Sequence, residues 1–150
     1  DSELAFCALL ERLRVLWLAD GPPSVESRLR VVQAFAAELR GLGPANFLYC
    51  DGDALFAHAD RRHQGDGTIR PPGLWRLARH CAAGGELSAA GLRIESHDAA
   101  QDVVLIASVP LTTENWIPLK AGEILIARAG HLQPAAINPA GAAGAHASGG

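Results

Sequence analysis

The hydrophobic pattern of this sequence changes its period once, near residue 45, and that change constrains the fold more than any other feature. Up to about residue 40, apolar residues recur three and four positions apart, which places them on one face of an α-helix. From residue 46 onward they alternate with polar residues or form short β-branched runs, as in strands. Helices and strands do not alternate along the chain. The sequence therefore predicts a layered α+β fold, with two helices followed by about six mostly antiparallel strands.

Two helices are expected ahead of residue 45. The first begins at Asp1 to Glu3, runs to about residue 19 and ends at Asp20-Gly21-Pro22-Pro23. Ser24 can cap the second, which ends near Gly41 and Gly43. Since a tight turn joins them, the helices should lie antiparallel in one layer. Each has an apolar stripe that should be buried: Leu4, Leu9, Leu10, Leu13, Leu16 and Trp17 in the first, and Val25, Leu29, Val32, Phe35, Ala36 and Leu39 in the second.

The clearest strand signal is a hairpin around Asp51-Gly52. Residues 46–50 and 53–58 are largely apolar and flank this Asp-Gly pair, which two-residue hairpin turns favour. The sequence therefore predicts two paired strands directly after the second helix.

Four further strands are expected, and residues 60–72 should form a surface loop. Val103 to Ser108 is almost wholly apolar and β-branched, so this strand should be central and covered on both faces. The four predicted strands are 74–79, 92–95, 103–108 and 123–128.

Composition and charge exclude several classes of protein. With 49% hydrophobic residues the chain is not disordered throughout, and its formal net charge of -3 gives no basic field for nucleic acid. The longest clean apolar run, Val103 to Pro110, is far shorter than the roughly 20 residues of a membrane helix. We therefore expect neither nucleic-acid nor membrane partners. A weaker alternative is a nucleic-acid contact through four arginines, Arg61, Arg62, Arg76 and Arg79.

Three cysteines are candidate nucleophiles, and each has a simpler interpretation as a reduced, half-buried thiol of a cytoplasmic protein. Cys7 should pack within the first helix, and Cys50 lies beside the hairpin turn with no base nearby in sequence. Cys81 follows His80, but neighbours on a strand point to opposite faces. We predict no catalytic residue among them.

The histidines show no metal-binding spacing. None is paired at i, i+4 or as His-x-His, so no metal site is predicted. Gly84-Gly85 is not followed by the Lys-Ser/Thr of a phosphate-binding loop, and we expect no cofactor. The six histidines are His58, His63, His80, His97, His131 and His146.

Four segments together resemble motifs of one family. They are Asp1 to Phe6 (T-D-S-E-x-x-F), Asn46 to His58 (N-F-x-x-x-D-G), Val104 to Thr112 (V-x-x-A-S-E-P-L-T) and Trp116 to Ile126 (W-x-x-L-x-x-G-E). They resemble the class II glutamine amidotransferase domains, which are N-terminal nucleophile hydrolases. In particular, they resemble a stand-alone subfamily that includes the ergothioneine-pathway hydrolase.

The resemblance implies an architecture. The family fold is a four-layer αββα sandwich, in which two antiparallel sheets lie between helical layers. Residues 1–132 would then be the distal, C-terminal portion of such a domain. Residues 133–150 are mostly Ala, Gly and Pro with no periodicity, and should form a disordered tail.

The resemblance also implies a chemistry, hydrolysis of the side-chain amide of glutamine or a γ-glutamyl compound. In the family an N-terminal Cys is the nucleophile and its own α-amino group the base, an Asn-Gly pair forms the oxyanion hole, and an Arg holds the substrate carboxylate. All of these would lie upstream of Asp1, on a missing N-terminal segment, so this chain alone should be inactive. Asp1 matches the acidic residue that binds the substrate's α-amino group, although it could equally cap the helix.

Several alternatives stay open. The chain could be a non-catalytic binding or assembly module that keeps the sandwich fold. In an enzyme, the released ammonia could go to water or to an ammonia-accepting synthase partner. Val109 stands where the subfamily usually has Glu before Pro110-Leu111-Thr112, so a hydrogen bond accepted by that Glu would be absent and the substrate is left open.

Overall fold

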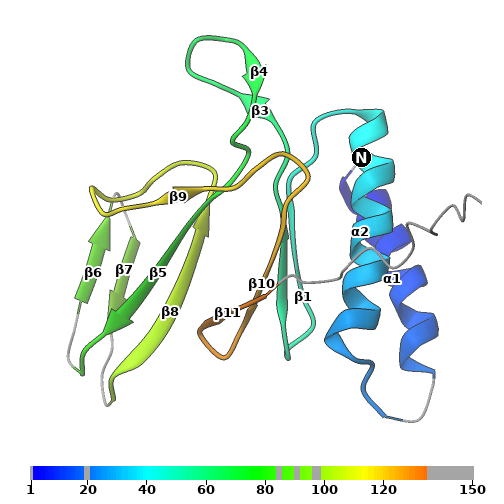
Figure 1. Cartoon of the computed structure of the whole chain (residues 1–150), viewed down its shortest axis with the longest axis horizontal. Coiled ribbons are helices and arrows are strands. Elements are labelled where there is room, and N and C mark those ends of the chain that lie inside the picture. The colour runs from blue at the N-terminus through cyan, green and yellow to red at the C-terminus, as the bar shows by residue number, and fades with distance from the viewer. Residues whose placement is uncertain (1, 19–20, 84–85, 90–91, 96–98, 135–150) are drawn as a thin grey trace, which may run out of the picture.

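The computed structural model describes residues 2–18, 21–83, 86–89, 92–95 and 99–134. Two helices come first along the chain, and short, mostly antiparallel strands follow, as the change of hydrophobic period predicts. Figure 1 shows the elements as successive layers: the helices, a four-stranded sheet beside them, and a three-stranded sheet beyond it. This is the α+β order expected for part of an αββα sandwich.

The helical layer consists of α1 (Ser2–Trp17) and α2 (Val25–Leu42). The Ser24 side chain caps α2 by accepting a hydrogen bond from the Ser27 amide at 3.1 Å, as predicted. At the other end, the Gly43 amide donates to the Leu39 carbonyl at 3.1 Å. Residues from the start of α1 and the end of α2 line the same cavity, so the two helices are antiparallel.

The buried face of α1 is narrower than its sequence pattern predicts. Leu9 and Leu13 are buried, but Leu4, Leu10 and Trp17 are exposed, so the prediction was wrong for these three. Because α1 lies along the outer strand of the sheet, only one side of the helix meets other described residues. Periodicity alone cannot show how much of an apolar face finds a partner.

The four-stranded sheet has the order β1-β2-β10-β11 and is antiparallel throughout. Its first pair is the predicted hairpin around Asp51-Gly52. The bounds are β1 (Phe47–Cys50), β2 (Leu55–His58), β10 (Ile124–Arg128) and β11 (His131–Gln133).

The three-stranded sheet has the order β8-β5-β9, with β5 (Trp75–Cys81) in the middle, β8 (Gln101–Ala107) on one side and β9 (Ile117–Pro118) on the other. The prediction that residues 103–108 form a central, doubly covered strand was therefore wrong. Among the described residues β8 is an edge strand, and its apolar side chains are half-buried. A β-branched run in the sequence indicates that a strand is buried, but it does not show whether other strands pair with both of its edges.

Two small hairpins complete the described chain. β3 (Arg62–His63) pairs with β4 (Ile69–Arg70) inside the predicted surface loop, and β6 (Glu86–Ala89) pairs with β7 (Leu92–Glu95). The sequence analysis missed β3, β4, β6, β9 and β11, all of four residues or fewer. β11 includes Gln133, the first residue of the predicted tail. Residues 135–150 lie outside the described part, so the tail stays a prediction.

Two apolar cores hold the layers together. Leu9, Leu29, Val32 and Phe56 belong to the core between the helices and the four-stranded sheet. The second core lies between the two sheets and includes Ala57, Leu74, Leu119 and Leu125, with Val104 and Ile106 packed against it. Alternate residues of the four-stranded sheet thus serve each core.

A buried arginine fixes the start of α2 to the hairpin turn. Arg28 donates to the carboxylates of Asp51 and Asp53, each at 2.6 Å, and its side chain is only 3% exposed. Its guanidinium also lies 5.8 Å from the centre of the Phe56 ring. Arg128 of β10 donates to Asp53 at 2.8 Å and extends the network to a third strand.

Replacing Arg28 by Met should lower the free energy of unfolding by about 3 to 5 kcal/mol, because the buried Asp51 carboxylate loses its countercharge. Urea denaturation measures this. Arg30→Met is the matched control on the exposed face of α2, where a change within about 0.5 kcal/mol is expected. Equal effects of the two substitutions would contradict a structural role for the buried pair.

Candidate functional site

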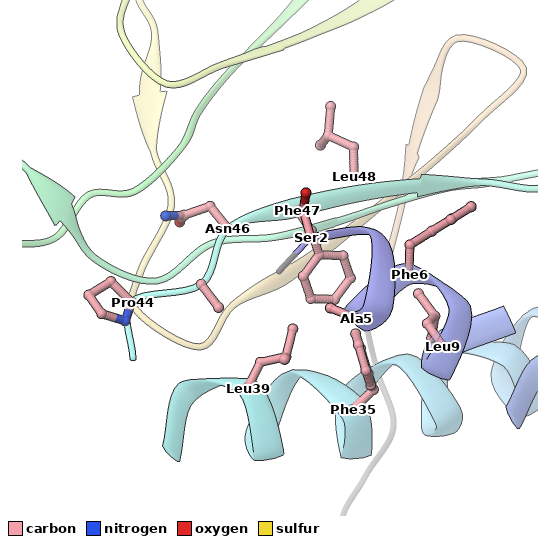
Figure 2. Close-up of a pocket in the computed structure, with 11 residues that line it drawn as sticks. Ser2, Ala5, Phe6, Leu9, Phe35, Leu39, Pro44, Asn46, Phe47 and Leu48 are labelled. Carbon is pink, nitrogen blue, oxygen red and sulfur yellow. The ribbon is translucent and has the colours of Figure 1, made fainter. Parts of the chain in front are cut away.

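A cavity of about 330 Å³ lies where the first turns of α1 meet the end of α2 and β1. Its lining is mostly apolar, and Ser2 and Asn46 contribute the polar side chains (Figure 2). Asp1, the predicted substrate-binding residue, is outside the described residues. Ser2, the next residue in the sequence, lines the cavity.

The wall of the cavity comes from the Asn-Phe motif at the start of the hairpin. The Phe47 ring packs edge-on against Phe35 of α2, with centroids 5.8 Å apart, and lies 5.3 Å from the ring of His58. Figure 2 shows Phe47 on the helix side of β1 and Leu48 on the opposite side. The alternation of β1 thus gives one apolar residue to the helical core and leaves the next one exposed.

Asn46 has a structural task in this motif. Its Oδ1 accepts a hydrogen bond from the Asp60 amide at 2.7 Å, and its Nδ2 donates to the Arg61 carbonyl at 2.8 Å. Gly73 packs so closely that a Cβ added there would lie 1.8 Å from Asn46 Oδ1. With both groups of its amide engaged, Asn46 joins the loop ahead of β1 to the segment that follows β2.

Asp60 is fully buried and links three segments. Its carboxylate accepts hydrogen bonds from Arg40 Nε at 3.1 Å and from the Ala45 amide at 3.4 Å, and Arg61 Nε lies 3.6 Å away. Burial raises the pKa of Asp60, but these donors outweigh burial and the net pKa lies below its usual value. The group stays ionised and structural, and it does not have the raised pKa of a general acid.

His58 is buried next to this junction. Neither of its ring nitrogens makes a hydrogen bond of good geometry with a described residue. Burial lowers the pKa of His58, and the attraction of Asp60 opposes that shift only in part. The imidazole is therefore neutral near pH 7 and packs as an apolar ring against Phe47.

The third and fourth motifs make the loop and turn beyond β8. Thr112 Oγ1 accepts a hydrogen bond from Trp116 Nε1 at 3.0 Å and donates to Glu114 at 2.9 Å, so the loop is closed on itself. Val109 is exposed in this loop. Its side chain has no polar atom, so it cannot accept the hydrogen bond that a Glu at this position would accept.

The turn before β10 is tied to the end of β2. The Gly122 amide donates to the Ala59 carbonyl at 2.8 Å, and the Ala59 amide to the Glu123 carbonyl at 3.0 Å. Gly122 has a φ of +83°, and a Cβ there would lie 2.6 Å from an Arg40 nitrogen. The Gly-Glu pair of the fourth motif therefore lets Arg40 cross the turn on its way to Asp60.

The candidate nucleophiles do not converge on a base. Cys7 and Cys50 are exposed and Cys81 is half-buried, so the prediction that Cys7 packs was wrong. His80, the residue before Cys81, is engaged elsewhere, because its Nδ1 lies 2.8 Å from Asp102 Oδ1. None of these thiols has a catalytic arrangement in the part of the chain that the structure describes.

The fold does bring together two histidines that the sequence analysis treated separately. His131 Nδ1 lies 3.5 Å from Asp102 Oδ2, so Asp102 stands between His80 and His131. No sequence spacing could have revealed this, because the three residues lie on β5, β8 and β11. In the described ranges, no group of three or more His, Cys, Asp or Glu is arranged to hold a metal ion. His97 and His146 lie outside those ranges.

The basic residues of the weaker nucleic-acid alternative are dispersed. Arg61 pairs with Asp60, and Arg79 lies 3.7 Å from Glu114. Across the described residues, no helix is both long and apolar enough to cross a membrane.

Comparisons with known proteins agree with one another. The family described as class II glutamine amidotransferases matches residues 1–148. A crystal structure of a predicted glutamine amidotransferase from Pseudomonas aeruginosa matches with a TM-score of 0.65 and 32% sequence identity. The match covers 88% of this chain and 49% of that one, so the chain spans about half the length of the solved structure. No curated protein matches.

The buried His58 should make stability depend on pH. Its folded pKa lies below the unfolded value of about 6.5, so unfolding takes up a proton as the pH falls below that value and stability is lost. His58→Leu should flatten the fall between about pH 7 and 5. Below about pH 4 both proteins should lose stability, because Asp51 and Asp60 have lowered pKa values.

Urea denaturation across this pH range measures the effect. His63→Leu, at an exposed position, is the control and should keep the original pH profile. A His58→Leu profile parallel to the original one would contradict the assignment.

Proposed function

Because this chain belongs to the class II glutamine amidotransferase family, we propose that it is the distal portion of a domain that hydrolyses the side-chain amide of glutamine or a γ-glutamyl compound. The observation that carries this proposal is the family match over residues 1–148, with 32% identity to the solved structure. The layer order supports it, since helices, sheet and sheet are three successive layers of an αββα sandwich.

In the proposed reaction the nucleophile comes from outside this chain. An N-terminal Cys on a preceding segment attacks the amide carbonyl, ammonia leaves, and water hydrolyses the thioester to release glutamate. The positions of Cys7, Cys50 and Cys81 support an external nucleophile, because none stands beside a base among the described residues. The free state of all three thiols fits a cytoplasmic protein.

Asp1 is the proposed substrate contact. Asp1 directly precedes α1 in the sequence, and its carboxylate would bind the α-amino group of a glutamine-like substrate by a charge-assisted hydrogen bond. The position of its neighbour Ser2 on the cavity wall supports this role. The stand-alone, ergothioneine-pathway-like subfamily remains the proposed subfamily, and Val109 is the departure that leaves its substrate open. A synthase that accepts the ammonia is a proposed partner.

The alternative proposal is a non-catalytic binding or assembly module. It is supported by the apolar character of the cavity and by the lack of a catalytic group there among the described residues. The codons ahead of Asp1 discriminate between the two: a Met-Cys start followed by an Asn-Gly pair supports the enzyme, and a start codon near Asp1 supports the module.

The 150-residue chain alone should release no ammonia or glutamate from glutamine, because it lacks the nucleophile and the oxyanion hole. Joined to the preceding segment, it should show glutaminase activity in a coupled glutamate assay. A triple Cys→Ser variant at Cys7, Cys50 and Cys81 should keep that activity. Turnover by the isolated chain that survives the triple substitution would refute the assignment of the nucleophile.

In the joined polypeptide, Asp1→Asn should raise KM for glutamine about 10- to 100-fold, the loss expected for one charged hydrogen bond. An amide that resembles glutamine but lacks the α-amino group should be hydrolysed equally well by the variant and the original. Glu3→Gln removes a neighbouring carboxylate and is the control for charge at the start of the helix. Equal losses with both amides would instead assign Asp1 to helix capping.

A further inference from the structure

The β3–β4 hairpin places two like charges directly opposite each other. Arg62 of β3 is the register partner of Arg70 of β4, so their side chains leave the same face of the hairpin. Like charges in this position destabilise a pair of strands. The hairpin is closed by Gln64 instead, whose Nε2 donates to the carbonyls of Arg70 and Pro72 at 2.8 and 3.2 Å. A choice of residues that opposes local stability is expected at functional sites.

Arg62 is also the arginine of this hairpin that has no carboxylate partner among the described residues. Arg70 lies 3.1 Å from Asp66, and Arg61 lies 3.6 Å from Asp60. Arg62 is half-buried, and its Nη1 donates to the carbonyl of the next residue at 3.1 Å. Its Nε is shielded from solvent and makes no hydrogen bond with a described residue. Because a partly desolvated cation without a countercharge is costly, Arg62 is suited to bind an anion.

The hairpin begins beside the candidate site. Asn46 lines the cavity together with Ser2, and its Nδ2 donates to the Arg61 carbonyl at 2.8 Å. Arg62 is the next residue along the chain. At the other end of the hairpin, Gly73 packs directly against the Asn46 side chain. Figure 1 shows the hairpin beyond the same end of the sheet at which α1 begins. Both ends of the hairpin are thus fixed to a residue of the cavity wall.

We propose that Arg62 is a specificity-determining residue that binds a carboxylate on the amine part of a γ-glutamyl substrate, with Arg70 adding positive charge across the hairpin. The inference rests on the proposed function and chooses between its two substrates, in favour of a γ-glutamyl amino acid over glutamine. A guanidinium has five N–H donors, and Arg62 uses one of them on a described residue, so donors remain for a carboxylate.

The chemistry of the substrate indicates which carboxylate this is. The glutamyl part has an α-amino group, for which Asp1 is proposed, and an α-carboxylate, which the family resemblance assigns to an Arg upstream. Beyond the scissile amide, glutamine releases only ammonia, whereas a γ-glutamyl amino acid releases an amine that carries a further carboxylate. Arg62 is a cation beside the site that this group can pair with. An acidic side chain of the preceding segment is the other source of the same chemistry, and the experiment distinguishes the two.

Two matched substrates test the inference in the polypeptide joined to its preceding segment. γ-Glutamylglycine ends in a carboxylate where γ-glutamylethylamide ends in a methyl group. The original protein should hydrolyse γ-glutamylglycine with a kcat/KM at least about tenfold higher, since one charged hydrogen bond is worth that much. Arg62→Met should lower this value about 10- to 100-fold and leave the value for the ethylamide nearly unchanged. Arg62→Lys, which keeps the charge, should recover part of the loss.

Arg30→Met, on the exposed face of α2, is the matched control and should change neither value. Equal efficiency of the original protein with the two amides overturns the inference, and so does an equal loss with both in Arg62→Met. If Arg62→Met lowers the free energy of unfolding and leaves the ratio of the two values unchanged, the anion is an acidic side chain of the preceding segment. That result also overturns the inference.

The NMR signal of the Arg62 Nε–H group measures binding apart from turnover, in a joined polypeptide whose N-terminal Cys is replaced by Ala. γ-Glutamylglycine should shift this signal, and γ-glutamylethylamide should not. The same response to both amides, or to neither, overturns the inference. Because this measurement needs no substitution at Arg62, it decides the question even if Arg62→Met does not fold.

The two measurements separate this inference from the proposed function. A shift with γ-glutamylglycine alone, in a protein whose unaltered form hydrolyses neither amide nor glutamine, supports the role of Arg62 in binding and overturns the proposed hydrolysis. Hydrolysis without discrimination between the two amides overturns the inference and leaves the function standing. A gene that begins at Asp1 overturns both.

Discussion

The position of α2 depends on two arginines that fix its two ends to the hairpin beneath it. Arg28 reaches Asp51 and Asp53 in the hairpin turn, and Arg40 reaches Asp60 just beyond β2. The Asp51 and Asp60 carboxylates are almost wholly buried. An unpaired buried charge is costly, so each pair allows only a narrow range of positions for its end of the helix. Apolar contacts alone would tolerate sliding of α2 over the sheet, whereas the two ion pairs set its register.

The position of α1 follows from that of α2. Arg12 of α1 makes two hydrogen bonds to Glu38, at 2.8 and 2.7 Å, and lies over the Phe35 ring. Leu9 and Leu13 complete the contact in the core. Because α2 already covers the middle of the sheet, α1 is placed along β1. The cavity at Ser2 is a consequence of that placement.

Local features of the fold could be predicted from the sequence, and features that depend on distant partners could not. Ser24 and Asp51-Gly52 act on residues within a few positions, so the cap and the hairpin were predicted correctly. The edge position of β8 depends on which strands flank it, and the exposure of Leu10 and Trp17 depends on what covers α1. A local sequence pattern shows neither the neighbours of β8 nor the cover over α1. β3, β4 and β11 are too short to show a period at all.

The candidate site also has features that the sequence predicts and features that depend on distant residues. Its motifs were visible in the sequence, but the tasks of Asn46 and Gly122 appear only when Asp60 and Arg40 are seen beside them. The burial of His58 and Asp60 had no signal in the sequence, because His and Asp side chains more often face water. The meeting of His80, Asp102 and His131 joins three strands, and no spacing along the chain encodes it.

Polar and apolar side chains have different tasks among the described residues of the chain. Its buried charges, Arg28, Asp51 and Asp60, are all used to join elements to one another, so they are not available for chemistry. Three of its exposed apolar residues, Phe6, Leu10 and Leu48, lie instead where α1 runs beside β1. A surface patch of this kind marks an interaction site in a folded protein. The buried ion pairs therefore fix the position of α2, and through it that of α1, and this placement brings the apolar residues of α1 beside β1.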